Sequence, residues 1–192
     1  MSLKFSSTTA DFLQWDEMVV LTQKLERDKE AITALLITIG SFTGLRISDI
    51  LTLSWGHFIG QTHLYIIEKK TKKKRTIKIN AELHKAVERV FNQSKCRIDA
   101  LILQNPKTKK ALSIQHINRM FKYLRLKYRL SISHFSTHSM RKTFGRRIWE
   151  TSGYSDKAIT MLSEIFNHSS FKITRRYLGI KAEEIEQVYD LL

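Results

Sequence analysis

The reactive side chains of this 192-residue sequence are tyrosine, histidine, arginine and lysine, because the familiar catalytic motifs are missing. No GxxxxGK(S/T) loop for nucleotides, no HExxH, no Cys/His metal spacing and no GxSxG elbow occurs. We therefore expect a reaction without metal or cofactor. It would depend on positioned cations and on a nucleophile that conserves bond energy in a covalent intermediate.

Arginine, histidine, lysine and tyrosine occur in three short segments: TGLRISDILTL at 43–53, HSMRKTFG at 138–145 and IFNHSSFKITRRYLG at 165–179. A helix would place His138 and Arg141 on one face, so that both could reach one phosphate. Arginine suits this task because its planar guanidinium binds two phosphate oxygens at once and stays charged at any working pH. A phosphate ester on tyrosine keeps enough bond energy for a later attack by a hydroxyl, so the exchange would need no ATP.

The charge balance indicates a polyanionic partner. Thirty-three Lys and Arg against eighteen Asp and Glu give a net charge of +15 and a pI near 10.0. Nucleic acid is the leading candidate, although a ribosomal or other basic protein without catalysis would have the same charge. No apolar run reaches the roughly 18 to 20 residues that span a membrane, and no signal peptide is recognisable. We expect a cytoplasmic protein, associated with the nucleoid when bound.

Apolar spacing predicts a mainly helical fold of the α+β class. Helices are expected over the following ranges: 15–25, 32–39, from Gly44 to about Leu53, 81–94, from the cap Ser113 to about Tyr128, 137–151, 155–166, and from about Ala182 to the end.

A β-hairpin is predicted between Thr62 and Asn80, where a β-prone run at 64–67 precedes alternation at 76–79. Its connection from Glu68 to Arg75, EKKTKKKR, is too charged for a core and well placed to meet phosphates. A solvated turn is equally consistent with this composition.

The three segments resemble, in the same order, the three boxes of the tyrosine recombinases, the phage integrase family. The nine-residue interval from His168 to Tyr177 equals the interval usual in that family. The resemblance implies a helical catalytic domain with a small three-stranded antiparallel sheet. It also implies a site-specific recombinase or integrase that cleaves and rejoins DNA through a 3′-phosphotyrosyl intermediate, in recombination or integration of a mobile element.

Carried over to this chain, the resemblance implies that Arg46 and Arg141 grip the scissile phosphate. It makes Tyr177 the nucleophile and lets His138 accept or share the tyrosine proton. His168 would donate a hydrogen bond to a non-bridging oxygen. Two positions depart from the family's usual pattern: Lys142 follows Arg141, and Asn167 stands where a glycine is common.

In the family, a lysine of the hairpin turn protonates the leaving 5′-oxygen. Lys70, before Thr71, matches that place, but the crowding of neighbouring lysines leaves the choice open. Further DNA contacts are expected from the remaining basic residues of the turn and of the other two boxes: Lys69, Lys72, Lys73, Lys74, Arg75, Lys142, Arg175 and Arg176.

Two expectations concern the surroundings of these residues. Asp49, one helical turn after Arg46, resembles the family's acidic residue and would support the site by pairing with a cation or orienting a neighbour. A surface acid is the other interpretation. We also expect Tyr177 to be accessible, since Thr174 and flanking arginines suit a dry interior poorly, and we expect nearby cations to lower its pKa.

We expect a single catalytic domain over 1–192, with a core at 12–180. Family members usually carry a DNA-clamping domain before the catalytic one, and only about a dozen residues precede the first helix here. The chain is thus expected to lack the clamp, either as a piece of a longer integrase or like the fimbrial invertases, which consist of little more than this domain.

The segment 181–192 is expected to form a helix that docks on a neighbouring copy within a DNA-bound homotetramer, with folding back onto its own chain as the alternative. Two other functions stay open at this point. One is a catalytically inactive DNA-binding module of the same fold. The other is relaxation of supercoiled DNA by the same chemistry, as in a type IB topoisomerase.

Overall fold

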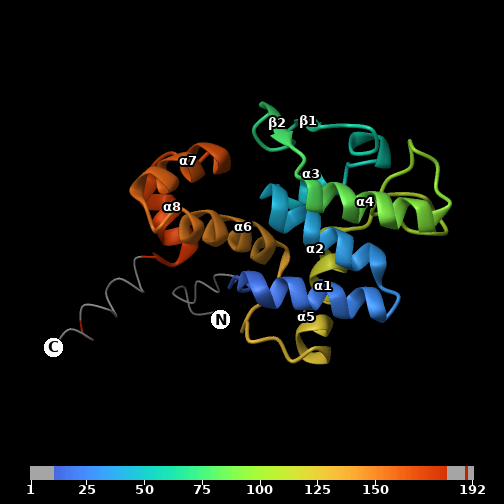
Figure 1. Ribbon diagram of the computed structural model, residues 1–192, viewed down its shortest axis with the longest axis horizontal. Coiled ribbons are helices and arrows are strands. Elements are labelled where there is room, and N and C mark those ends of the chain that lie inside the picture. Colours follow the sequence, from blue (N-terminus) through green and yellow to red (C-terminus); the bar gives the residue numbers. More distant parts are fainter. Residues whose placement is uncertain (1–10, 181–188, 190–192) are drawn as a thin grey trace, which may run out of the picture.

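The computed structural model describes residues 11–180 and 189, and these form a mostly helical molecule with one small sheet (Figure 1). The elements follow one another as α1 (Trp15–Arg27), α2 (Ala31–Thr43), α3 (Ile47–Ile50), a 3-10 turn (Trp55–His57), β1 (His63–Ile67), β2 (Lys74–Lys78), α4 (Ala81–Ser94), α5 (Ile114–Lys127), α6 (Thr137–Thr151), α7 (Asp156–Phe166) and α8 (Phe171–Leu178). The predicted mainly α class is confirmed. None of the helices in the described ranges is both long enough and apolar enough to cross a membrane.

Helix α2 lies at the centre, in contact with α1, α4 and α6. Nine of its 13 residues are buried, and most of these are apolar, so it can pack on several sides at once. It approaches α6 closely at Gly40, where an added Cβ would lie 2.5 Å from the sulfur of Met140. The helix ends at Gly44, whose φ of 60° is the left-handed conformation that glycine adopts without strain.

The sheet has two antiparallel strands rather than the three that were expected. β1 pairs with β2 in a register that runs from His63 opposite Lys78 to Ile67 opposite Lys74. A short apolar run at 100–103, which follows α4, does not join this sheet: the amide of Ile102 donates to the carbonyl of Leu53, next to a single bridge between Ser54 and Leu101. The backbone of this run is therefore hydrogen-bonded to the segment that follows α3, and the described residues contain no third strand.

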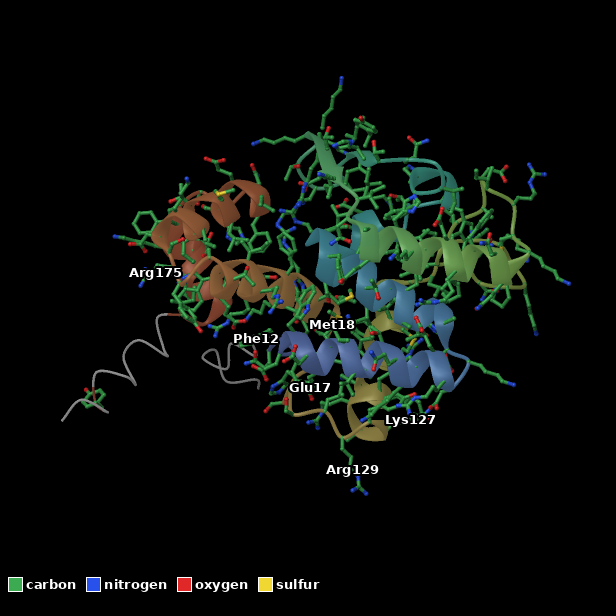
Figure 2. The ribbon with its side chains drawn as sticks, viewed as in Figure 1. Phe12, Glu17, Met18, Lys127, Arg129 and Arg175 are labelled. Atoms are coloured by element: carbon green, nitrogen blue, oxygen red, sulfur yellow. The ribbon has the colours of Figure 1, made fainter. Side chains whose placement is uncertain are left out.

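Two clusters of buried apolar side chains share α6. The larger cluster contains residues of α1, α2, α4 and α5, including Met18, which is 1% exposed. Charged side chains such as Arg129 lie outside it and extend outward (Figure 2). The smaller cluster consists of Trp149, Ala158, Ile159, Leu162, Phe166, Leu178 and Ile180. Because α6 contributes Met140 to the first and Trp149 to the second, it holds α7 and α8 against the rest of the molecule.

Most predicted helices are confirmed, and so is the predicted cap at Ser113. The hydroxyls of Ser113, Ser136 and Ser155 accept backbone N–H groups at the starts of α5, α6 and α7. Helix α8 was not predicted. It is only eight residues long and too short to show a full amphipathic repeat. The expected C-terminal helix lies outside the described residues, apart from Tyr189.

Candidate active site

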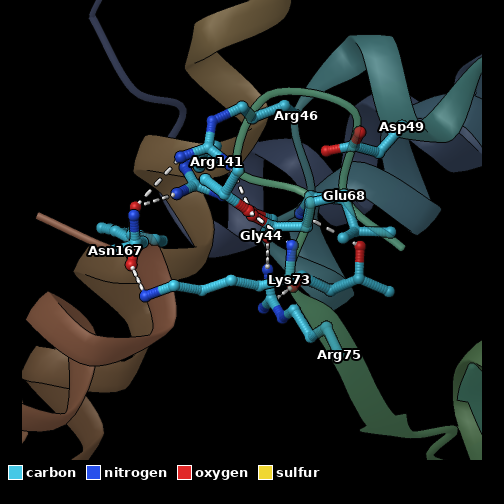
Figure 3. A network of polar contacts seen from close by, with 12 residues as sticks. Gly44, Arg46, Asp49, Glu68, Lys73, Arg75, Arg141 and Asn167 are labelled. Carbon is cyan, nitrogen blue, oxygen red and sulfur yellow. Dashed lines mark hydrogen bonds and ion pairs between the residues drawn. The ribbon is translucent and has the colours of Figure 1, made fainter. Parts of the chain in front are cut away.

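Two arginines from distant parts of the chain converge on one oxygen atom (Figure 3). Arg46 follows the left-handed end of α2 and donates from Nη2 to the carbonyl of Phe166 over 3.1 Å. Arg141, in α6, donates from Nη2 to the same carbonyl over 3.0 Å and from Nη1 to the carbonyl of Gly44. The acceptor lies at the C-terminal end of α7, where the helix dipole is negative and attracts cations.

Arg141 is almost completely enclosed, with 5% of its surface exposed. Its guanidinium carbon lies 4.2 Å from the centre of the Phe166 ring, a cation–π contact. Burial lowers the pKa of Arg141 to about 10, and the charges of Arg46 and Arg75 act in the same direction. Arg141 remains charged at neutral pH.

The expectation that the whole connection of the hairpin is too charged for the interior is wrong for Glu68, which is buried. It is 3% exposed, and its carboxylate accepts hydrogen bonds from Arg46 (2.8 Å), Arg75 (3.2 Å) and the hydroxyl of Thr71 (2.7 Å). Burial by itself would raise the pKa of Glu68, but hydrogen bonds from Thr71 and Arg46 outweigh it and hold the pKa below its usual value. The acid is buried because it is fully paired.

Asp49 is also buried, at 2% exposure, so the interpretation as a surface acid is wrong. Its Oδ1 accepts the backbone N–H of Lys69 over 2.8 Å. Its partner is therefore an amide of the hairpin turn rather than a cation. The supporting role expected of Asp49 stays a prediction.

The lysine side chains of the turn are exposed, and two of them are tied to the site. Lys73 donates from Nζ to Oδ1 of Asn167 over 2.6 Å. The charge of Lys70 contributes to lowering the pKa of His138, so Lys70 acts electrostatically on that histidine. Asn167 ends α7 with a φ of 50°, a conformation that asparagine tolerates better than most residues, which explains its place where glycine is common in the family.

The remaining basic residues fall into two groups. Lys69, Lys72, Lys74 and Arg176 are exposed, and Arg175 projects from α8 with a partner in Asp156 at 3.2 Å (Figure 2). Arg75 is turned inward, toward Glu68 and the carbonyl of Thr43, and Lys142 is 7% exposed with Nζ 5.3 Å from the centre of the Tyr177 ring. That these residues contact DNA stays a prediction.

The two histidines differ in their surroundings. His138 lies in the first turn of α6 and is exposed, and desolvation of its ring followed by the charge of Arg141 lowers its pKa. His168 is half-buried, with Nδ1 2.9 Å from the hydroxyl of Thr174, a residue with no exposed surface. Burial lowers the pKa of His168 to about 4, with help from Arg141 and Arg46, so this ring is neutral at pH 7.

Tyr177 is less accessible than expected. Its ring packs edge-on against Phe166 and His168, with centroid distances of 5.6 and 5.4 Å. The hydroxyl is buried and has no hydrogen-bond partner among the described residues. Burial raises the pKa of Tyr177 to about 12, although Arg141 and Arg46 act to lower it, so the expected net lowering is also wrong.

The helical arrangement of α8 explains this burial. Thr174 and Leu178 are buried on the side that faces α6 and α7, and Tyr177, three residues after Thr174, lies next to them on that side. Arg176 stays exposed. Adjacent arginines therefore do not keep a neighbouring tyrosine in solvent, because consecutive helical residues point in different directions.

The structure thus brings Arg46, Arg141, His168 and Tyr177 together around the end of α7, where Phe166 contacts all four. Sequence reasoning missed two groups, the Glu68 carboxylate and the Phe166 carbonyl. Glu68 could have been suspected as the one acid in a run of cations, since a lone carboxylate there has several possible partners. A backbone carbonyl leaves no such signal.

Known proteins resemble this chain in sequence. Residues 11–184 match the model of the phage integrase family. A probable integrase/recombinase of Bacillus subtilis, YoeC, is 32% identical over 155 residues, covering 80% of this chain and 81% of the relative. The tyrosine recombinase XerH of Campylobacter jejuni is 26% identical over 154 residues, which are 79% of this chain and 42% of XerH.

Solved structures share the fold. The XerA recombinase superposes with a TM-score of 0.72 at 18% identity, over 96% of this chain and 64% of that one. XerH bound to a palindromic difH substrate gives a TM-score of 0.69 at 18% identity, over 94% and 53%. The chain therefore spans less than two thirds of these two recombinases. On the family match and this shared fold, the chain belongs to the phage integrase family and has the fold of a tyrosine recombinase catalytic domain.

Proposed function

We propose that this chain is a site-specific recombinase that cleaves and rejoins DNA strands through a covalent bond between a 3′-phosphate and Tyr177. The observation that carries the proposal is the convergence of Arg46 and Arg141 on one oxygen. Two guanidiniums that can share a carbonyl oxygen can also bind non-bridging oxygens of a phosphate placed there, and so stabilise the charge of a pentacovalent transition state.

Double-stranded DNA at a specific site is the proposed substrate. The net charge of +15 favours a polyanion, and the exposed lysines of the hairpin turn lie beside the proposed phosphate position. Two of the similar structures, XerH with difH and the Tn1549 integrase with a circular intermediate, are complexes with DNA.

In the proposed first step, the Tyr177 oxygen attacks the phosphorus, an O–P bond to tyrosine forms, and the bond from phosphorus to the 5′-oxygen breaks. The tyrosine proton goes to His138, and Lys70 supplies a proton to the leaving 5′-oxygen. In the second step, a 5′-hydroxyl of another strand attacks the phosphotyrosine and releases Tyr177. One phosphate ester replaces another in each step, so no ATP is consumed.

His168 would act as a neutral donor. Its pKa of about 4 keeps the ring uncharged near pH 7. A neutral ring that accepts the Thr174 hydroxyl hydrogen at Nδ1 keeps its own hydrogen on Nε2, and this N–H can then donate to a phosphate oxygen. Thr174 would thereby set which nitrogen carries the proton.

The Tyr177 hydroxyl is buried, and this bears on how the proposed reaction would begin. A tyrosine with a pKa of about 12 is a poor nucleophile at pH 7, and its oxygen has no hydrogen-bond partner among the described residues to take the proton. The proposal therefore requires α8 to shift when DNA binds, so that the oxygen reaches the phosphate held by Arg46 and Arg141.

Assembly is part of the proposal as well. We expect four copies on DNA, with the segment 181–192 of each copy docked on its neighbour. Deleting residues 182–192 should reduce the DNA-bound assembly seen by native gel electrophoresis or mass photometry. Assembly of the truncated chain at the wild-type concentration would contradict the exchange of this segment.

A trapping experiment can test the chemistry before the DNA site is identified. The protein is incubated with a pool of duplexes in which random sequence flanks a nick, so that cleavage near the nick releases a short oligonucleotide and leaves the protein attached. Adducts that survive SDS are digested with protease. The DNA is then sequenced, and the modified peptide is identified by mass spectrometry.

The expected adduct lies on Tyr177 and is absent from Tyr177→Phe. Tyr154→Phe, a change to an exposed tyrosine outside the site, should leave adduct formation intact. An adduct formed by Tyr177→Phe would refute the assignment. DNA binding without any adduct would instead favour an inactive binding module, and relaxation of supercoiled plasmid without site preference would favour a topoisomerase.

A further inference from the structure

We propose that Glu68 is a positioning residue for this reaction, which joins the phosphate-binding Arg46 to the turn that presents Lys70. The inference rests on the proposed function and adds a residue to it. Glu68 lies at the end of the β1 segment, where the chain enters the turn, and is 3% exposed. Neither the three boxes nor their spacing includes it.

The Glu68 carboxylate binds three donors from three segments of the chain (Figure 3). Oε2 accepts from Nη1 of Arg46 at 2.8 Å and from the Thr71 hydroxyl at 2.7 Å, while Oε1 accepts from Nη1 of Arg75 at 3.2 Å. Arg46 precedes α3, Thr71 belongs to the turn, and Arg75 belongs to β2. One buried anion thus fixes the relative positions of all three.

The contact with Arg46 determines how that guanidinium is presented. Nη1 is held by Glu68, which leaves Nη2 directed at the oxygen that Arg141 also binds. Without the carboxylate, Arg46 would face the nearby charges of Arg75 and Arg141 with less compensation. We expect its guanidinium then to move away from them, and the shared oxygen to lose one of its two donors.

The contact with Thr71 fixes the turn on one side of Lys70, and Asp49 fixes it on the other. The N–H of Lys69 donates to Asp49 over 2.8 Å, and the hydroxyl of Thr71 donates to Glu68. The turn is closed by backbone hydrogen bonds between Glu68 and the residues 72 and 73. The backbone of Lys70 is therefore anchored on both sides, while its ammonium group stays exposed for the 5′-oxygen.

Two variants separate these functions of Glu68. Glu68→Gln keeps the size of the side chain but removes the charge that holds Arg46. Thr71→Val keeps the shape of Thr71 but removes the hydroxyl that anchors the turn, and it leaves the pair of Glu68 and Arg46 in place. Glu88→Gln, at an exposed position of α4, makes the same change in net charge outside the site and serves as the control.

Each variant is tested in single-turnover cleavage of a duplex recovered from the trapping experiment. The duplex is used with its natural 5′-bridging oxygen and with sulfur in that position. A thiolate leaves without a proton, so the sulfur duplex does not need the general acid. Thermal unfolding of each variant shows whether the fold is retained, and titration with DNA separates binding from the rate at saturation.

We expect Thr71→Val to cleave the oxygen duplex about 10-fold more slowly and the sulfur duplex within about 2-fold of the wild type. Glu68→Gln should be about 100-fold slower on oxygen and still about 10-fold slower on sulfur, because Arg46 is misplaced as well. DNA binding by Glu68→Gln should change less than its cleavage rate at saturation, because the rise of one in net charge offsets the loss of one phosphate donor. The control should behave as the wild type.

Wild-type cleavage rates for a folded Glu68→Gln would overturn the inference. So would a Thr71→Val defect of equal size on both duplexes, since the turn would then not act through the general acid. If the wild-type chain forms no adduct at all, the proposed function fails and the inference fails with it. A wild-type adduct together with an unaffected Glu68→Gln would refute the inference alone.

Discussion

Replacing Tyr177 by phenylalanine should make the protein more stable, even though it removes the proposed nucleophile. The Tyr177 hydroxyl is buried without a hydrogen-bond partner among the described residues. A buried polar group in that state costs about 1–3 kcal/mol, because it has lost its bonds to water. The ring contacts with Phe166 and His168 are kept in Tyr177→Phe.

We expect the free energy of unfolding to rise by about 1–2 kcal/mol in Tyr177→Phe, and the melting temperature by roughly 3–6 °C for a chain of this size. Urea unfolding at pH 8, followed by circular dichroism, measures the first quantity. Differential scanning calorimetry measures the second.

The advantage of the variant should grow at alkaline pH. Burial raises the pKa of Tyr177 to about 12, above the usual 10, so the folded state resists loss of the proton. The stability of the wild type is therefore unaffected by this group below pH 10 and falls as the pH rises from 10 to 12, by about 0.8 kcal/mol at pH 10.5. Phenylalanine has no proton to lose, so the difference between the two proteins should widen by that amount.

Two other tyrosines provide matched controls. The hydroxyl of Tyr128 donates to Asp28 over 2.7 Å, so Tyr128→Phe should lower the stability by about 0.5–1 kcal/mol. Tyr154 is 63% exposed, and Tyr154→Phe should change the stability by less than about 0.5 kcal/mol. If Tyr177→Phe unfolds at or below the wild-type urea concentration, the buried hydroxyl is not a destabilising group and the reasoning is wrong.

Three further predictions follow from the site. Thr174→Val should slow single-turnover cleavage about 10-fold, because it releases His168. The free energy of unfolding should change by less than the activation free energy of cleavage. An unchanged rate would contradict the role of Thr174. Gly44→Ala should cost about 2–4 kcal/mol in urea unfolding, because its φ is positive and the new Cβ would lie 2.5 Å from the Phe144 ring. The pKa of His168 is lowered to about 4, so its neutral ring contributes to the free energy of unfolding above pH 6.5, and this contribution is lost as the pH falls toward 4. The free energy of unfolding of His168→Asn should therefore depend less on pH in this range.

Regular periodicity made most of the fold predictable. Helices α4 and α6 begin and end at the predicted residues, because apolar positions recur every three or four residues and a cap marks the start. The third strand was implied by the family resemblance rather than by periodicity, and the described residues do not form it. The apolar run at 100–103 is hydrogen-bonded to Leu53 and Trp55, and partners that distant in the chain cannot be inferred from local composition.

Four of the residues predicted for the site lie close together, but their environments were not predictable from the sequence. Tyr177 and Glu68 were both expected near solvent on the basis of charged neighbours, and both lie largely inside. The burial of Glu68 depends on Arg46 and Arg75, and that of Tyr177 on the packing of α8 against α6 and α7. Such partners are set by tertiary structure, which a reading of adjacent residues does not include.

In the proposed reaction, a phosphate that binds Arg46 and Arg141 would have to displace the carbonyl of Phe166. Because Arg46 and Arg141 already share this acceptor, an incoming anion gains only the difference between its own hydrogen bonds and those it replaces. A free phosphate ion or nucleotide must open the contact alone. A duplex brings many additional ionic contacts along its backbone, so only a long polyanion has a large surplus. On the proposed function, the Phe166 carbonyl would therefore favour long polyanions over short ones, before any contact with a base forms.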